Sequence, residues 1–261
     1  MNSSLIITTY NWPEALSLVL SSLNEQTVLP DEVIIADDGS EDSTKIVIDN
    51  FKNSSSIPII HSWQKDKGFR LSKSRNKAIA KAKSEYIIMI DGDMVMHKDF
   101  IKDHKRFAKK NTYLQGGRVL LQKDFSLKLL NKKQFNKPRL FSSDFKNKIN
   151  SLRLPFLSFI ISLRSSVSLN RVRGCNFSIH REDIIRVNGF NEDFVSWGKE
   201  DSEFVSRLFH HGILRKDMKF SGLQYHLFHK EGFAQHNNLE LLDITISKKL
   251  DWCLKGIDQY L

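Results

Sequence analysis

The first third of the chain alternates short apolar runs with stretches that predict helices. The runs are rich in β-branched residues, as buried strands are, and cover residues 5–9, 32–36, 57–61 and 86–90. The predicted helices lie between them, at residues 14–25, 41–51 and 71–83. Ser40 or Asp42 is expected to cap the second helix. This alternation predicts an α/β fold with parallel strand pairing and right-handed crossovers.

Beyond residue 120 the pattern breaks and then resumes. Residues 121–173 are rich in Lys, Arg, Phe, Leu and Ser, and they include the apolar run 154–163 (LPFLSFIISL). Regular structure is predicted again after this segment, with a strand at residues 174–180 and a short helix at 183–187. A loop at 189–198 then leads to a longer helix at 200–211. The sequence therefore predicts a basic, apolar insertion between two ordered parts.

The composition favours a folded protein with one unusually basic segment. The chain has 261 residues, of which 40% are hydrophobic, enough for the core of one large α/β domain. The net charge is +10, and residues 121–173 alone hold twelve basic and two acidic residues. Charge alone would suit a nucleic-acid-binding protein. An excess confined to one stretch favours a local anion-facing surface instead.

Localisation is indicated by the N-terminus, the hydropathy and the cysteines. The apolar run 5–7 is too short for the core of a signal peptide. No stretch reaches the roughly 18–20 apolar residues that span a bilayer. Cys175 and Cys253 lie far apart and form no disulfide framework, which fits a reducing compartment. We therefore expect a cytoplasmic protein, either soluble or attached to the inner face of the cell membrane.

Three polar motifs close three of the predicted strands. They are residues 8–11, which include Thr8, Tyr10 and Asn11, then residues 37–40, and then Asp91-Gly-Asp93. In sheets of this kind, ligands bind beyond the carboxyl ends of the strands. The convergence of three motifs on one rim predicts a binding site there.

Asp91 and Asp93 are the best candidates for a metal site. Two carboxylates at the end of a buried strand can share one divalent ion, and Mg²⁺ or Mn²⁺ suits carboxylate oxygens. Such an ion would neutralise a diphosphate leaving group. The alternative is a turn with solvated carboxylates, which the apolar strand before it disfavours.

The other two donor-side motifs suit a nucleotide. A carboxylate at residues 37–38 could accept the N3–H of a uracil ring, with Gly39 allowing a sharp turn; a helix cap is the alternative. Further along, Gly68 would permit close backbone approach, and Arg70 and Arg75 could reach diphosphate oxygens. A solvated basic helix face is the alternative there.

The C-terminal third offers a base, a stacking surface and further metal ligands. Glu200 and Asp201 stand at a predicted helix start, where a carboxylate could act as general base, and Trp197 could stack on a sugar ring. Ordinary charge bias at a helix start is the alternative. His226 and His229 are three residues apart; imidazoles could complete a carboxylate metal site, although most histidines have no such role.

These residues resemble a known family. The segments TTYNWPEALSLVLSSLNEQT (8–27), IIADDGS (34–40), KGFRLSKSRNKAI (67–79) and IIMIDGDMVM (87–96) resemble family 2 glycosyltransferases of GT-A fold, in the expected order. Residues 173–212 resemble the C-terminal module of β1,4-galactosyltransferases, and bacterial chondroitin-type polymerases share that pairing. The resemblance implies a single mixed, mostly parallel sheet flanked by helices.

The resemblance also implies roles for individual residues. On the donor side, Asp38 would contact the uracil, Asp91 the ribose side of a UDP-sugar, and Asp93 the metal ion. Asp201 falls where the family has its catalytic base, and Glu200 where it contacts the acceptor, beside Trp197 and Gly198. His226 and His229 fall near the remaining metal ligands, and His229 is favoured. Lys199 and Ser202 depart from the galactosyltransferase pattern, which leaves the acceptor open.

Together these observations predict an inverting, metal-dependent glycosyltransferase. It would move a hexose or N-acetylhexosamine from a UDP-sugar to a glycan or glycolipid acceptor in surface polysaccharide synthesis. Residues 1–120 would bind the nucleotide sugar, 174–261 would bind the acceptor and supply the base, and 121–173 would face the acceptor or an anionic membrane surface. A nucleotidyltransferase is the closest alternative. No nucleic-acid partner is expected, because DNA or RNA binding would leave the ordered carboxylates unexplained.

Overall fold

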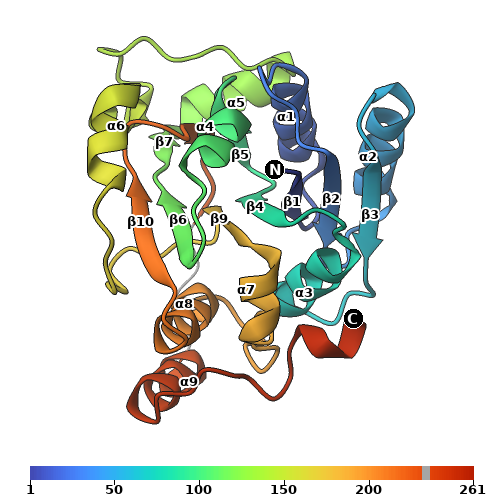
Figure 1. Ribbon diagram of the computed structural model, residues 1–261. Coiled ribbons are helices and arrows are strands. Elements are labelled where there is room, and N and C mark those ends of the chain that lie inside the picture. Colours follow the sequence, from blue (N-terminus) through green and yellow to red (C-terminus); the bar gives the residue numbers. More distant parts are fainter. Residues whose placement is uncertain (231–235) are drawn as a thin grey trace.

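The computed structural model describes residues 1–230 and 236–261, and a seven-stranded sheet forms its centre. The strands lie in the order β10-β6-β9-β4-β1-β2-β3, which Figure 1 shows from left to right. Their bounds are β1 (Ser3–Thr9), β2 (Glu32–Asp37), β3 (Ile59–Trp63), β4 (Tyr86–Asp91), β6 (Thr112–Gly116), β9 (Asn176–His180) and β10 (Leu214–Met218). All neighbouring strands pair in parallel except at β9. The predicted mixed, mostly parallel α/β sheet is therefore confirmed.

Helices cover both faces of this sheet. On one face lie α1 (Pro13–Asn24), α2 (Asp42–Ser54), α4 (Phe100–Phe107) and α5 (Lys123–Lys132); on the other lie α3 (Leu71–Lys81), α7 (Arg181–Arg186), α8 (Glu200–His210) and α9 (His236–Ser247) (Figure 1). The side chains of β1 alternate between the two faces, because successive residues of a strand point in opposite directions. Leu5 and Ile7 pack in one core, and Ile6 packs in the other.

Most predicted elements occur within a few residues of their expected positions, but the expected cap of α2 is wrong. The N-cap residue is Glu41, and no side chain caps the helix. Ser40 has another role: its hydroxyl accepts a hydrogen bond from the backbone N–H of Asn11 at 2.9 Å. Its own N–H donates to Oδ1 of Asp37 at 2.8 Å. Ser40 thus joins the ends of β1 and β2 rather than starting the helix.

Strand β9 runs against both of its neighbours. Ile90, near the end of β4, pairs with Asn176, the first residue of β9. The residues just before β9 therefore lie at the same rim as the carboxyl ends of β1, β2 and β4. This reversal brings Gly174 and Cys175 to the rim that carries the predicted donor motifs.

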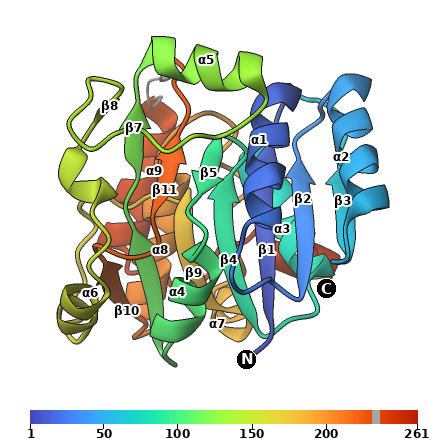
Figure 2. The same ribbon diagram turned by 90° about the horizontal axis from the view of Figure 1, so that it is seen from above.

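A second, four-stranded sheet joins two distant parts of the chain. Its order is β5-β11-β7-β8, with bounds β5 (Met94–Met96), β7 (Val119–Leu121), β8 (Phe145–Lys146) and β11 (Gln224–His226) (Figure 2). Strands β5 and β11 are antiparallel, and Met94 pairs with His226. Asp93, the residue before β5, is thereby brought beside His226, the last residue of β11, and His229 just after it.

The basic segment 121–173 contains α5, β8 and a short helix, α6 (Pro155–Ser162). Helix α6 buries its serines, Ser158 and Ser162, and exposes apolar side chains. The exposed apolar residues in and beside it are Leu154, Phe156, Leu157, Phe159, Ile160 and Leu163. Within the described residues, no helix combines the length and the apolar character that crossing a bilayer requires.

Candidate active site

The Asp91-Gly92-Asp93 turn is held against the end of β1. The hydroxyl of Thr8 donates a hydrogen bond to Oδ1 of Asp91 at 2.9 Å. A Cβ atom on Gly92 would lie 2.6 Å from the carbonyl oxygen of Thr8, too close for any other residue without a shift. The glycine between the carboxylates is therefore required by close packing, and this packing aims both carboxylates beyond the rim.

Asp93, His226 and His229 converge on one point. His226 Nε2 and His229 Nε2 each lie 3.1 Å from Asp93 Oδ2, and the two nitrogens lie 3.0 Å apart. Neighbouring ligands of an octahedral ion, at bond lengths of about 2.1 Å, lie about 3 Å from one another. The three atoms therefore have the spacing of one face of such a coordination shell.

The surroundings of this triad fit a cation. The second oxygen of Asp93, Oδ1, is buried and accepts no hydrogen bond within the described part of the chain. Burial alone would raise the pKa of Asp93, but hydrogen bonds from His226 and His229 lower it. The contact with Asp93 raises the pKa of His229 to about 9. Trp12 packs edge-on against the His229 ring, with centroids 6.1 Å apart, and fixes its orientation.

Arg75 lies at the centre of a cluster of carboxylates. Its side chain is 2% exposed, and Nη1 donates to Oδ1 of Asp201 at 2.7 Å. Nη2 lies 3.4 Å from Oδ1 of Asp91, and Nη1 lies 3.7 Å from Oε1 of Glu200. Burial would lower the pKa of Arg75, but the charges of Asp201, Asp91 and Glu200 raise it. Arg75 is therefore a permanent cation that ties α3 to β4 and α8.

Asp201 is also held from a second side. The backbone N–H of Gly174 donates to its Oδ2 at 2.6 Å. A Cβ atom on Gly174 would lie 2.5 Å from Oδ1 of Asp201 and 2.7 Å from Nη2 of Arg75. Only glycine therefore allows this approach. With one oxygen on Arg75 and the other on Gly174, the carboxylate cannot rotate freely.

Glu200 is held less completely than the adjacent Asp201. Its side chain is 8% exposed, and Oε2 is buried without a hydrogen-bond partner among the described residues. Burial, followed by the charge of Asp201, raises the pKa of Glu200 to about 7. Near neutral pH it is therefore a proton donor or acceptor with a free oxygen.

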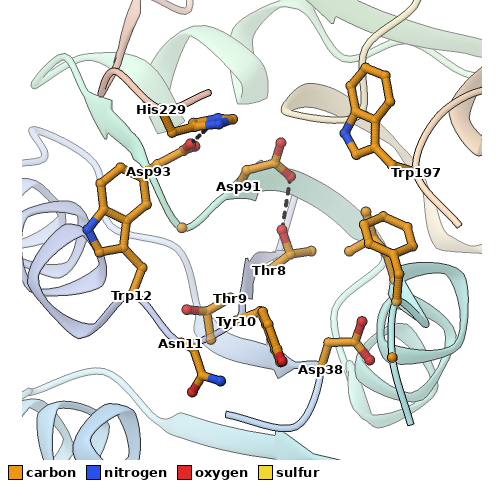
Figure 3. A pocket seen from close by; sticks show the side chains of 14 residues that line it. Thr8, Thr9, Tyr10, Asn11, Trp12, Asp38, Asp91, Asp93, Trp197 and His229 are labelled. Carbon is orange, nitrogen blue, oxygen red and sulfur yellow. Dashed lines mark hydrogen bonds and ion pairs between the residues drawn. The ribbon is translucent and has the colours of Figure 1, made fainter. Parts of the chain in front are cut away.

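Two adjoining cavities surround these groups. One, of about 570 Å³, lies beyond the ends of β1, β2 and β4 and includes Asp38, Asp91 and Asp93 in its wall. Figure 3 shows Trp12 and Trp197 on opposite sides of it, with Asp91 between them. The second, of about 390 Å³, is lined by Arg75, Glu200 and Asp201 among others. The residues common to both walls are Leu71, Asp91, Trp197 and His229.

Asp38 forms the far end of the larger cavity. Its Oδ1 accepts a hydrogen bond from the Gln64 amide at 2.7 Å, and its Oδ2 accepts one from the backbone N–H of Arg70 at 2.8 Å. Burial raises the pKa of Asp38 despite these contacts. Gly68 lies in the same wall with φ of +76° and no atom within 4 Å of its Cβ position, so a ligand can approach its backbone.

The structure brings together nearly all residues that the sequence singled out. Thr8, Tyr10, Asn11, Asp38, Gly68 and Asp93 line the larger cavity, Arg75, Gly198, Glu200, Asp201 and His226 line the smaller one, and Asp91, Trp197 and His229 line both. Arg70 is in neither wall, and within the described residues the one hydrogen bond of its guanidinium runs from Nη1 to the Phe69 carbonyl oxygen, at 3.4 Å. The diphosphate roles of Arg70 and Arg75 therefore remain predictions.

Sequence analysis missed several residues of the two walls. Trp12 packs on a metal-ligand candidate, and its position directly after the Thr8–Asn11 motif was the available signal. Arg173 and Gly174 were included only within the basic segment, the predicted strand 174–180 and the segment 173–212 of the resemblance, with no role of their own, although both line the smaller cavity. Nothing in the local pattern marks them, because their position follows from the reversed direction of β9.

The sequence is similar to those of known glycosyltransferases. Residues 4–168 match the model of glycosyl transferase family 2, and residues 155–230 match a model described as the N-terminal domain of galactosyltransferase. The chain is 27% identical to a chondroitin synthase of Escherichia coli, covering 85% of this chain and 34% of that protein. It is 26% identical to a validoxylamine A glucosyltransferase of Streptomyces hygroscopicus subsp. limoneus, covering 80% of this chain and 48% of that protein. The chain thus spans less than half the length of either relative.

Solved structures share the fold. S. aureus TarS 1–349 in complex with UDP-GlcNAc superposes with a TM-score of 0.67 at 17% identity, over 100% of this chain and 70% of that one. A mannosyltransferase from Pyrobaculum calidifontis, in complex with GDP-Man and Mn²⁺, gives 0.59 at 17% identity, over 89% of this chain and 58% of that one. The predicted GT-A fold is confirmed by these matches.

Proposed function

The chain belongs to glycosyl transferase family 2, and on that premise we propose that it transfers a hexose or N-acetylhexosamine from a UDP-sugar to a hydroxyl of a glycan or glycolipid, with inversion. The observation that carries this proposal is the pair of cavities that share Asp91, Trp197 and His229. One cavity has the size and groups for a nucleotide sugar, and the other contains a fixed carboxylate for the acceptor. A reaction between two bound substrates needs this arrangement.

The larger cavity suits the donor. Asp38 has hydrogen-bond acceptor capacity left for a uracil N3–H, since a carboxylate has about four lone-pair sites and two are used. Thr8, Tyr10, Asn11 and Gly68 complete that end, and Asp91 lies where the ribose and diphosphate follow. The TarS structure was solved with UDP-GlcNAc, which supports a UDP-sugar and an N-acetylhexosamine.

Asp93, His226 and His229 would hold a divalent cation beside the diphosphate. The mixture of imidazole nitrogens with one carboxylate favours Mn²⁺ over Mg²⁺, because imidazole suits transition metals better. When bound, the ion would neutralise charge on the leaving UDP. The Mn²⁺ in the mannosyltransferase structure supports the same type of cofactor.

Asp201 would act as the general base. Its carboxylate takes the proton of the acceptor hydroxyl while that oxygen attacks the anomeric carbon, and UDP leaves on the opposite face of the sugar. Arg75 and Gly174 fix the two oxygens of Asp201, so the base is oriented before the acceptor arrives. Glu200, whose free oxygen faces the same cavity, would bind a second acceptor hydroxyl, with Trp197 and Gly198 beside it.

We also propose that the enzyme docks on an anionic membrane through α6. The helix exposes Phe156 at 79% and Phe159 at 46% while it buries its serines, the reverse of a helix that packs on a core. Exposed Lys146, Lys148 and Arg164 flank it. An apolar face surrounded by cations complements a lipid surface with negative headgroups.

The decisive experiment is a screen of UDP-sugars that measures UDP release in the presence of Mn²⁺ and candidate sugar acceptors. Transfer predicts acceptor-dependent UDP release with a glycoside product. A nucleotidyltransferase would use the same carboxylates and metal but release inorganic diphosphate and no UDP. That product would overturn the proposal.

A further inference from the structure

The smaller cavity continues into a region with unusually high positive charge. Arg173 lines the wall that also contains Asp201, and it lines a neighbouring cavity of about 360 Å³ as well. Arg171, Arg215 and Lys219 line that neighbouring cavity, and Asp217 is the one acidic residue in its wall. A ligand that extends from the base through the smaller cavity therefore reaches guanidinium groups next.

The backbone of Arg173 is fixed by a buried amide. Gln115, 3% exposed, accepts the N–H of Arg173 at 3.1 Å through Oε1 and donates to its carbonyl oxygen at 3.0 Å through Nε2. The next residue, Gly174, donates its N–H to Asp201. Gly174 thus orients Asp201, while Gln115 fixes the backbone of the adjacent Arg173. The fold therefore sets the distance between Asp201 and the start of the Arg173 side chain.

The charge of Arg173 is not compensated within residues 1–230 and 236–261. No ion pair or hydrogen bond of its guanidinium occurs in that part of the chain, whereas Arg215 contacts Asp217 at 2.6 Å. Burial, then the charges of Arg118, Arg171 and Arg215, lower the pKa of Arg173. Crowding cations in a partly buried place costs free energy, which a bound anion would recover.

We propose that Arg173, with Arg171 beside it, forms a subsite for an anionic group, a carboxylate or a phosphate, on the acceptor next to the sugar whose hydroxyl reacts. The inference rests on the proposed transferase function and adds a chemical class of acceptor to it. A guanidinium recognises either group through two parallel N–H···O bonds. An uncharged acceptor would leave Arg173 partly desolvated and without a counter-ion, so the site would discriminate against it.

The test compares matched sugars that differ only in the group at C6, which is charged in two of them. Glucuronic acid, glucose 6-phosphate and glucose are offered to the full chain with UDP and Mg²⁺, and binding is measured by saturation-transfer NMR. The same three sugars are then placed next to the reacting sugar in matched disaccharide acceptors, and UDP release from the active donor is compared. Variants are Arg173→Gln, Arg173→Lys, and Arg139→Gln as control, since Arg139 is an exposed arginine of the same segment outside these cavities.

We expect at least one charged sugar to bind roughly ten- to a hundredfold more tightly than glucose, because charge-assisted hydrogen bonds are lost with the neutral ligand. Arg173→Gln should abolish that preference, Arg173→Lys should keep part of it, and Arg139→Gln should leave it unchanged. The charged sugar that binds more tightly shows whether the subsite prefers a carboxylate or a phosphate. Equal binding of all three sugars by the wild type, or a preference that survives in Arg173→Gln, would overturn the inference.

The binding measurement separates this inference from the transferase function. If no acceptor supports UDP release but Arg173→Gln still abolishes the charge preference in binding, the anion subsite stands and the proposed transfer fails. If UDP release occurs equally well with charged and neutral acceptors, transfer stands and the anion subsite fails.

Discussion

Arg75 and Asp201 are 126 residues apart in the chain, yet Nη1 of Arg75 lies 2.7 Å from Oδ1 of Asp201 in the wall of the smaller cavity. Nη2 of the same guanidinium lies 3.4 Å from Oδ1 of Asp91, which lines both the smaller and the larger cavity. Because Arg75 is 2% exposed, these contacts are screened little by solvent. The position of the candidate base is thereby coupled to the turn that contains the metal-ligand candidate Asp93.

Replacing Asp201 with Asn should remove the base and keep the shape of the site. Without it, transfer should fall by about 10²–10⁴-fold, the usual contribution of a general base. UDP binding should persist, because Asp201 is not in the wall of the larger cavity, where the nucleotide is proposed to bind. Turnover and UDP calorimetry check both statements, with the exposed Asp243→Asn on α9 as control. Near-wild-type turnover in Asp201→Asn would exclude this role.

Gly174→Ala tests whether the orientation of Asp201 matters. The added Cβ would meet Oδ1 of Asp201 at 2.5 Å and Nη2 of Arg75 at 2.7 Å, and both side-chain ends can move aside. We expect a small change in melting temperature and a loss of turnover of roughly ten- to a hundredfold, since a displaced base is costly. Gly212→Ala is the contrasting control: its φ of +82° strains any other residue by about 1 kcal/mol, but it lies outside the site. Equal turnover in both variants would argue against a positioned base.

The triad of Asp93, His226 and His229 predicts metal-dependent nucleotide binding. Asp93→Ala and His226→Ala should each weaken the Mn²⁺-dependent part of UDP affinity at least about tenfold, because each removes one of three ligands. Affinity measured in EDTA should change little. Calorimetry with and without Mn²⁺ reports both values, and the exposed His211→Ala serves as control. A wild-type affinity that is the same in EDTA would refute the metal site.

His104 predicts a loss of stability in acid. It is fully buried, with Nδ1 2.7 Å from the Ser178 hydroxyl and Nε2 3.1 Å from Oδ1 of Asn176, and burial lowers its pKa to about 3. The unfolded chain, with a pKa near 6.5, therefore takes up the proton first. The stabilising contribution is complete above pH 6.5 and decreases as the pH falls towards 3, by about 1.4 kcal/mol per unit.

Urea unfolding at pH 7, 6, 5 and 4 measures this slope. His104→Gln should be less stable at pH 7 but should lose stability less steeply between pH 6 and 4 than the wild type. His211→Gln, at an exposed position, should keep the wild-type slope. Parallel slopes for wild type and His104→Gln would show that His104 is not the group responsible.

Helix α6 predicts binding to anionic vesicles. Phe156→Ser and Phe159→Ser should each reduce flotation with phosphatidylserine-containing liposomes roughly tenfold, because each removes an apolar side chain that would enter the lipid. Salt should weaken binding of the wild type. The control is Leu254→Ser, which removes a 91% exposed apolar side chain elsewhere. Failure of the wild type to float at low salt would reject docking.

The parts of the fold that the sequence predicts are those with local signals. Strands β1, β2 and β4 are apolar runs that end in polar motifs, and in parallel strands such ends must meet at one rim, so Thr8, Asp38 and Asp91 could be assigned to a site in advance. Glu200 and Asp201 followed from a helix start. The assigned residues needed no knowledge of distant contacts.

What the sequence did not predict depends on pairing between distant segments. The direction of β9 is set by its contacts with β4 and β6, so Gly174 and Arg173 gave no local sign of their position. The small sheet that brings His226 to Asp93 consists of strands of two or three residues, too short for a periodic pattern. The apolar run 154–163 was predicted only as part of a basic, apolar insertion, and the burial of Ser158 and Ser162 shows which side of α6 faces inward.

The position of β9 also determines the order in which the molecule can be completed during synthesis. Along the chain, β6 is the next strand of the large sheet after β4, but β9, whose residues 176–180 come two-thirds of the way along, lies between them in the sheet. Until the ribosome has made β9, β4 is an open edge that another chain could pair with. From the synthesis of β4 until that of β9, this strand edge is therefore exposed to pairing with other chains.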